Sequence, residues 1–142
     1  MKMAVPCSIT YSAEDAVWYV ESPDMYSGLI TYGETLDEAK AMAADALTGL
    51  IEVMIDYDEE LPPPSTLSGP DIYPIELPHS LSFAIWLRAK RKASGLSVAE
   101  LAERLGVKIR VYKDLENPAI ANPSLETLKR LEKVFGEEIV LV

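Results

Sequence analysis

The chain has 142 residues, of which 49% are apolar and 25% are charged, and its formal net charge at pH 7 is −10. This composition is typical of one ordinary globular domain or two small ones. The acidic total excludes a chain that coats nucleic acid along its whole length, because an acidic surface repels a polyanion. A single cysteine, Cys7, excludes a disulfide framework, and a single histidine, His79, excludes a zinc finger. No apolar run reaches the roughly 18 residues of a membrane helix and the N-terminus lacks the apolar stretch of a signal peptide, so we expect a cytoplasmic protein.

The charge is divided unevenly along the chain. Residues 1–78 hold two lysines against fifteen acidic residues, a net charge of −13, whereas residues 79–142 hold eleven basic against eight acidic residues, a net charge of +3. This asymmetry indicates two domains with different partners, although an acidic surface can also serve solubility alone. We therefore expect one domain over 1–78 and a second over 79–142.

The first domain is predicted to be a compact α+β unit with the element order β-β-β-α-β. Thr35 and Glu38 form a capping-box pattern at the start of a helix whose apolar stripe extends from Leu36 to Tyr57. A proline-rich connector over 61–70 follows the helix. Alternating apolar residues and runs of β-branched and aromatic residues predict the strands. They are expected over residues 5–11, 16–21, 29–32 and 71–77.

The second domain is predicted to be helical up to residue 135, with a short apolar strand over 138–142. Ser97 and Glu100 form a second capping-box pattern, and Gly106 allows a tight turn between two helices. The helices are expected over residues 81–94, 98–105, 108–116 and 125–135.

The most specific pattern is the run from Leu96 to Val107, which describes a helix, a glycine turn and the start of a second helix. Small Ala102 stands where the two helices would touch. The pattern resembles the helix-turn-helix of Cro/repressor-like (XRE) proteins over about residues 83–135. The residues that carry the resemblance are Arg91, Gly95-Leu96-Ser97, Glu100-Leu101-Ala102, Gly106-Val107, Leu115-Glu116-Asn117 and Pro123 to Leu128.

The resemblance implies that the helix beginning at Lys108 lies in the major groove of DNA. Arg110 is the candidate for guanine readout, because a guanidinium can bond O6 and N7 together. Asp114 is a candidate acceptor from cytosine N4, and Ile109 is a candidate contact to a thymine methyl. The candidate DNA-binding residues are Ser97, Lys108, Ile109, Arg110, Lys113 and Asp114, with Arg88, Arg91 and Lys92 as further phosphate anchors.

Three residues depart from the usual pattern of this helix-turn-helix family. Val98 stands where glutamine is frequent, Pro118 replaces the usual glycine, and Asp114 places an acid on the recognition helix. These departures leave the expected fold intact, but they leave the operator sequence open. The alternative to DNA binding is that the basic side chains only form a solvated helix face.

The apolar end of the chain allows two interpretations. The strand can pair within its own domain, or two copies of it can pair across a two-fold axis and form the dimer that half-sites about 34–36 Å apart require. We favour a homodimer or a higher even-numbered oligomer, because an unpaired apolar edge is an aggregation hazard. The candidate dimerisation residues are Ile139, Val140, Leu141 and Val142.

The first domain offers few candidate residues for catalysis or metal binding. The acids Glu14, Asp15, Glu21 and Asp24 could hold a metal ion, but no basic or nucleophilic residue accompanies them, and a solvated turn is the simpler explanation. Cys7 alternates with apolar residues and is expected in the core. We therefore expect no catalytic site, no metal and no cofactor.

The first domain contains, in this order, Trp18-Tyr19-Val20, Pro23-Asp24, Ser27-Gly28, Tyr32-Gly33-Glu34-Thr35 and Asp37-Glu38-Ala39. With these residues, the first 77 positions resemble the HicB antitoxin family. The resemblance implies a partial, degenerate ribonuclease-H-like fold without catalysis, and a HicA-type toxin as partner: a small, basic, mRNA-cleaving ribonuclease. The acidic domain would cover the RNA-binding face of that toxin, and the second domain would repress the shared operon. The candidate toxin-binding residues are Tyr19, Glu21, Asp24, Met25 and Tyr26.

Two other classes of function stay open at this point. A stand-alone transcriptional regulator would use the first domain to bind a small effector in an apolar pocket. An enzyme would need Glu14, Glu21 and Asp24 to bind Mg²⁺ together.

Overall fold

The structure, a computed structural model, describes residues 3–139. Its internal contacts divide the chain into two compact units, one of residues 3–77 and one that begins at Pro78. Each unit buries its own set of apolar side chains. None of the helices in the described residues combines the length and the apolar character needed to cross a bilayer.

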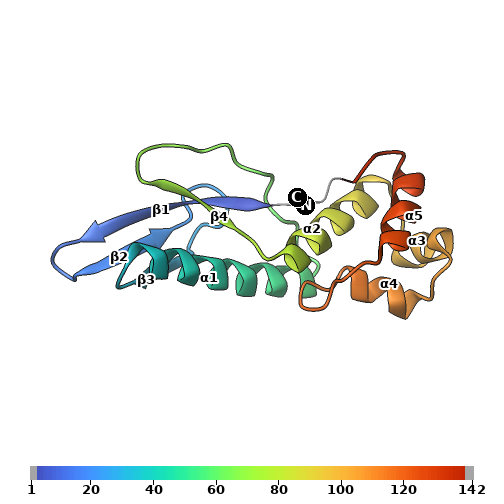
Figure 1. The fold of residues 1–142 in the computed structure, drawn as a ribbon, viewed down its shortest axis with the longest axis horizontal. Helices are drawn as coiled ribbons and strands as arrows, with labels where there is room; N and C mark the ends of the chain where they lie inside the picture. Colours follow the sequence, from blue (N-terminus) through green and yellow to red (C-terminus); the bar gives the residue numbers. More distant parts are fainter. Residues whose placement is uncertain (1–2, 140–142) are drawn as a thin grey trace. The chain divides into compact units, whose positions relative to one another are not determined.

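The first unit is a four-stranded antiparallel sheet with one helix packed across it (Figure 1). The strand order is β3-β2-β1-β4. Helix α1, Leu36–Asp56, contacts all four strands. The predicted α+β class and the element order β-β-β-α-β are confirmed. The strands are β1 at Ala4–Ser12, β2 at Val17–Glu21, β3 at Ile30–Gly33 and β4 at Ile72–Glu76.

The period-two pattern of β1 decides which face of the sheet meets the helix. Val5, Cys7 and Ile9 are buried, and the register pairs Val5 with Ile75 and Ile9 with Val20. Directly opposed residues share a face, so these side chains form one apolar layer. The helix presents buried residues spaced four apart to this layer. They are Ala39, Ala43, Leu47 and Ile51.

Helix α1 begins close against β3. The Thr35 hydroxyl accepts a hydrogen bond from the backbone N–H of Glu38 at 3.0 Å, as the capping pattern predicts. A Cβ on Gly33 would lie 2.3 Å from the backbone nitrogen of Ala39, so only glycine permits this approach. At the other end the prediction was wrong for Tyr57. It is the C-cap residue and is 76% exposed, because the helix ends at the residue before it.

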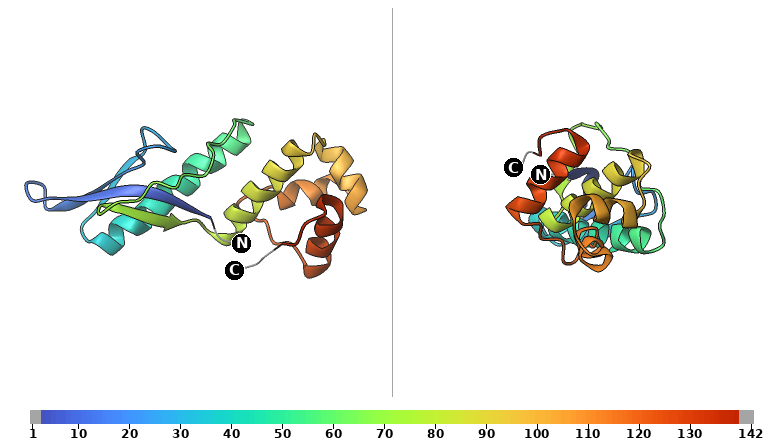
Figure 2. Two further views of the ribbon diagram at one scale, coloured as in Figure 1. Left: turned by 90° about the horizontal axis from the view of Figure 1, so that it is seen from above. Right: turned by 90° about the vertical axis from the view of Figure 1, so that its right-hand side faces the viewer.

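The described part of the second unit consists of four helices gathered around one core (Figure 2). Their number and order match the sequence pattern. They are α2 at His79–Ala93, α3 at Val98–Leu105, α4 at Ile109–Leu115 and α5 at Leu125–Phe135.

The predicted terminal strand over 138–142 is wrong where it can be compared. Glu138 and Ile139 are not in a strand. Ile139 packs instead against the helical core, and its backbone N–H donates to Glu132 Oε1 at 3.4 Å. Ile139, the first apolar residue of the predicted strand, therefore makes an intramolecular contact instead of pairing with another strand. The remaining candidate dimerisation residues, Val140, Leu141 and Val142, lie outside the described residues.

Candidate functional site

Helices α3 and α4 form a helix-turn-helix pair whose ends are held by local hydrogen bonds. The Ser97 hydroxyl accepts from the Glu100 N–H at 3.1 Å, and Glu100 Oε1 accepts from the Ser97 N–H at 3.1 Å, which completes the predicted capping box. Gly106 has a φ of 72°, a left-handed conformation that glycine adopts without a Cβ clash. The Val107 N–H then donates to the Ala102 carbonyl at 3.0 Å and closes the turn.

The seam between α3 and α4 is filled by the side chains that their spacing predicts. Ala102 is 1% exposed, and its small side chain allows the second helix to cross closely. Tyr112 is fully buried and extends from α4 into the core of the unit. The other apolar residues of this seam that are buried in the same core are Leu101, Leu105 and Leu115.

A charged network anchors the end of α4 to the end of α2. Arg91 Nε donates to Glu116 Oε2 at 2.7 Å, and Nη2 donates to Oε1 at 3.1 Å. The Tyr112 hydroxyl donates to the same carboxylate, and Arg91 Nη1 donates to the Leu96 carbonyl at 3.2 Å. The hydrogen bond to Glu116 raises the pKa of Arg91, while burial, followed by the Glu116 hydrogen bond, raises the pKa of Tyr112. The network therefore holds the C-terminal end of α4 against α2.

The outward side of α4 carries the predicted DNA-contacting residues together. Arg110 is exposed within the first turn, and Ile109 is 47% exposed beside it. Val111 is also exposed, although the sequence had not singled it out. The structure thus brings a compact group of cationic and apolar side chains to one surface of a short helix. The exposed members predicted from sequence are Lys108, Ile109, Arg110, Lys113 and Asp114.

Two of the predicted phosphate anchors are placed differently. Arg88 is 6% exposed, so its guanidinium is not displayed at the surface as a phosphate contact requires. Arg91 is committed to Glu116, and the two side chains are 13% and 12% exposed. Both expectations are corrected for the same reason. Successive basic residues near the end of α2 point in different directions around the helix axis, so only some of them face solvent. Lys92 and Ser97 are exposed.

A second arginine, which no sequence motif singles out, supports the helix pair. Arg130 on α5 donates through Nη1 to the Leu105 carbonyl at 3.1 Å, at the last residue of α3. Its Nη2 donates to Glu126 Oε1 at 2.7 Å. Arg130 lies 25 residues from Leu105, and Arg91 lies 25 residues from Glu116. No local sequence pattern reports contacts at such a separation.

In the first unit, the candidate toxin-binding residues do not form one surface. Tyr26, one of the candidate contacts, is 6% exposed, and its backbone N–H donates to Ser22 Oγ at 2.9 Å, so the loop folds inward and does not display the ring as a toxin contact requires. Met25 is half-buried, whereas Glu21 and Asp24 are exposed. The Ser65 hydroxyl donates to the Asp24 carboxylate.

Tyr19, the remaining candidate, lies on β2 rather than on the loop. Its hydroxyl donates to Asp15 Oδ2 at 2.7 Å, and its ring lies 6.3 Å from the ring of Tyr32. Asp15 stands in the turn between β1 and β2.

No group of three or more His, Cys, Asp or Glu that could hold a metal ion occurs within residues 3–139. Glu14, Glu21 and Asp24, which the metal-enzyme alternative needs together, are therefore not assembled into such a group.

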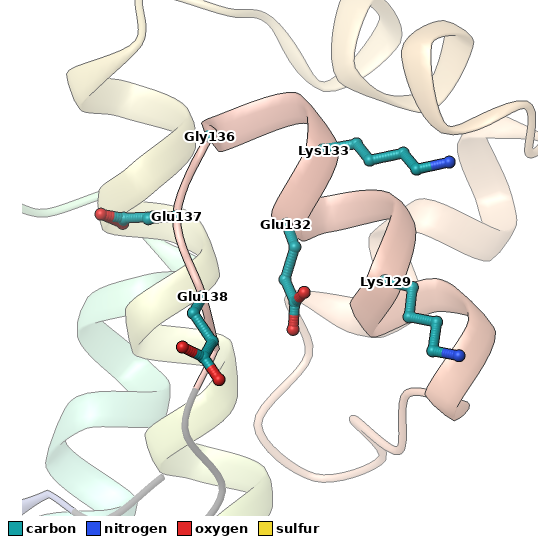
Figure 3. A pocket seen from close by; sticks show the side chains of 6 residues that line it. All are labelled: Lys129, Glu132, Lys133, Gly136, Glu137 and Glu138. Carbon is teal, nitrogen blue, oxygen red and sulfur yellow. The ribbon is translucent and has the colours of Figure 1, made fainter.

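An open hollow of about 470 Å³ lies between the second half of α5 and the segment that follows it (Figure 3). Figure 3 shows lysines along α5 and glutamates on the segment that follows it. Glu137 pairs with Lys90 of α2 and thereby ties this segment to the rest of the unit. The hollow carries charges of both signs and none of the predicted site residues. It is lined by Lys129, Glu132, Lys133, Gly136, Glu137 and Glu138.

Comparison with known proteins gives matches for both units. Residues 5–74 match the family described as HicB_like antitoxin of bacterial toxin-antitoxin system, and residues 87–142 match a helix-turn-helix family. The chain is 30% identical over 142 residues to Antitoxin HicB of Escherichia coli (strain K12), covering 99% of each chain. It is 32% identical over 134 residues to Antitoxin HicB 2 of Photorhabdus laumondii subsp. laumondii, covering 94% of this chain and 93% of the relative.

Among solved structures, a chain of a toxin-antitoxin complex from Streptococcus pneumoniae aligns with a TM-score of 0.49 at 22% identity. The alignment covers 72% of this chain and 95% of that one. The family rests on the sequence relatives, which match nearly the full chain in the order of units described above. This chain belongs to the HicB family of antitoxins and carries a helix-turn-helix domain.

Proposed function

We propose that this antitoxin neutralises a HicA-type, mRNA-cleaving toxin with its acidic first unit and represses the shared operon through its helix-turn-helix. The observation that carries the proposal is the uneven distribution of charge between the two units of the chain. A unit with a net charge of −13 precedes a helix pair that displays basic residues on its second helix. We also propose that the first unit is a partial ribonuclease-H-like fold in which no catalytic function is retained.

DNA binding is proposed to place α4 in the major groove. Arg110 would read guanine through two parallel hydrogen bonds, and Ile109 would contact a thymine methyl. Asp114 would accept from cytosine N4. Lys108, Lys113 and Lys92 would neutralise DNA phosphates, and Ser97 would contact the DNA backbone from the start of α3.

Toxin neutralisation is proposed to act by charge complementarity. A toxin that binds RNA needs a cationic surface, and an acidic protein surface of matching shape speeds encounter and denies RNA that surface. Glu21 is an exposed acid on β2, the strand that carries Tyr19, and Asp24 is exposed in the loop after β2, where its carboxylate also accepts from the Ser65 hydroxyl. The half-buried Met25 stays a candidate at the edge of the loop.

The DNA proposal is tested by fluorescence anisotropy with a labelled duplex taken from upstream of the chain's own reading frame. Arg110→Ala is expected to lose about 1–3 kcal/mol of binding free energy and to discriminate less against a substituted operator. Lys113→Ala is expected to weaken binding to all sequences and to reduce the salt slope by about one unit. Lys129→Ala, which removes an exposed lysine of α5, is the matched control. Unchanged affinity and specificity for Arg110→Ala would remove Arg110 from the interface.

We further propose that the protein acts as a homodimer or a higher even-numbered oligomer through residues that follow Ile139. Deletion of 140–142 spares Ile139, which packs within its own unit. Light scattering is expected to show monomers of the shortened chain. An oligomer that survives the deletion would place the interface elsewhere.

A further inference from the structure

The sheet of the first unit has one face that α1 does not cover. Val20 on β2 is buried on the helix side, so its neighbours Tyr19 and Glu21 project from the opposite side. The register places Tyr19 opposite Tyr32 and Glu21 opposite Ile30. Four side chains from β2 and β3 therefore share one face.

This face exposes two large apolar side chains close together. Ile30 is 69% exposed and Tyr32 is 57% exposed, two positions apart on the same edge strand. On β1, Thr10 stands opposite Tyr19 and is exposed as well. A contiguous exposed apolar group with a polar surround marks an interaction surface, and isolated exposed apolar residues do not.

The aromatic part of the face is held in place before any partner binds. The Tyr19 and Tyr32 rings are tilted by 60° with centroids 6.3 Å apart. The Tyr19 hydroxyl donates to Asp15 Oδ2 at 2.7 Å, which fixes the ring at its outer end. Rigid aromatic side chains lose little conformational entropy on binding, and they are enriched among residues that dominate binding energy.

The charge around this face selects the partner. Residues 3–35, which form β1, β2 and β3 with their connections, contain five acidic residues and no lysine, arginine or histidine. Glu21 stands within the face, Asp15 at the hairpin end, and Asp24 in the loop after β2. A second copy of this face would bring like charges together across a two-fold axis, which disfavours self-association. A cationic protein meets complementary charge instead.

We propose that the open face of β2 and β3 is the surface on which the basic toxin docks, with Ile30 and Tyr32 as apolar anchors and Glu21 as the acidic contact beside them. The inference rests on the proposed function and makes it specific. It moves the contact from the loop after β2, where Tyr26 is buried, to the sheet. The anchors displace water, and Glu21 meets a cationic side chain of the toxin at the edge of the apolar contact.

The test uses the whole 142-residue chain and the purified small basic protein encoded by the adjoining reading frame, with the dissociation constant measured by titration calorimetry. Ile30→Ser and Tyr32→Ala are both at exposed positions, so folding is expected to survive, and circular dichroism checks it. Tyr32→Ala is expected to weaken binding about 30-fold, as a central anchor does, and the double variant further. Val53→Ser and Tyr57→Ala, which remove exposed apolar residues at the far end of α1, are the matched controls and are expected to stay within about twofold.

A salt series separates the charge from the apolar contact. Wild-type affinity is expected to fall with NaCl, and Glu21→Gln is expected to reduce that dependence. If the wild type binds the toxin and the double variant binds equally well, the docking face is wrong while the proposed function stands. If the double variant alters the oligomeric state by light scattering and leaves toxin affinity intact, the face serves a second copy and the proposal is overturned. A wild-type chain that does not bind the toxin refutes the proposed function itself.

Discussion

Replacement of Arg91 is the sharpest test of the contacts that fasten α4 to the rest of its unit. In Arg91→Met the Glu116 carboxylate loses two charge-assisted hydrogen bonds of 2.7 and 3.1 Å and stays in a site where its side chain is 12% exposed. Breaking a buried ion pair on one side costs about 3–5 kcal/mol. Residual solvent access favours the lower end, so we expect a loss of about 3 kcal/mol in the free energy of unfolding of this unit.

The companion variants identify the cause of that loss. Replacing both partners in Arg91→Met/Glu116→Leu removes the stranded charge, and stability is expected to return to within about 1 kcal/mol of the wild type. The Tyr112 hydroxyl would then lack its acceptor, so Tyr112→Phe is added as a third change and is expected to help in that background. In the wild-type background Tyr112→Phe alone is expected to cost about 1 kcal/mol.

Urea unfolding followed by tryptophan fluorescence measures these differences in one unit at a time. Trp86 belongs to the helical unit and packs against Phe83 and Phe135, with ring centroids 5.9 and 6.0 Å away. The only other tryptophan is Trp18 in the first unit, so a Trp18→Phe background isolates the signal. Arg104→Met, at an exposed position of α3, is the control and is expected to change stability by less than about 0.5 kcal/mol. An Arg91→Met variant as stable as this control, or a double variant no better than the single one, would refute the reasoning.

Three further outcomes are expected. Gly33→Ala should destabilise the first unit by at least about 1–3 kcal/mol in thermal unfolding, because its Cβ would lie 2.3 Å from the backbone nitrogen of Ala39; an unchanged melting temperature would contradict this contact. Burial and then the charge of Asp24 raise the pKa of Cys7 to about 11, so the folded protein at pH 8 should resist a thiol reagent that modifies it fully in urea, and rapid labelling of the folded chain would show the thiol to be accessible. The hydrogen bonds with Ser97 lower the pKa of Glu100 below its ordinary 4.5, so its stabilisation of α3 is complete above that pH and is lost as the pH falls below it. The stability difference between the wild type and Glu100→Gln should therefore shrink in acid; a constant difference would exclude the ionised cap.

Local sequence signals predicted most elements of this chain because each depends on residues close together. Ser97 and Glu100 are three residues apart and form the complete capping box. Thr35 accepts the bond that its position predicts. Where a prediction needed the shape of the whole unit, it was less successful: Tyr57 ended outside the core and Tyr26 inside it.

The candidate surfaces divide in the same way. The exposed residues of α4 follow from helical periodicity, because a short amphipathic helix must turn one side away from its core. The roles of Arg88 and Arg91 could not be read from composition, since a basic run on a helix has inward and outward members. Ile30 and Tyr32 belonged to no sequence motif of binding residues, and only the pairing of β2 with β3 brought them beside Tyr19 and Glu21.

By itself, the sequence determined the order of the elements, the helix-turn-helix and the separation of a −13 part from a +3 part, because periodicity, caps and charge are properties of neighbouring residues. The tertiary structure alone decided which charges are free to act. Arg91 and Glu116, 25 residues apart, neutralise one another in a partly buried ion pair. The register of β2 with β3 left acidic and aromatic side chains together on an uncovered face. Contacts between distant residues are set by packing, and packing decides whether a charged or apolar side chain supports the fold or stays available to a partner.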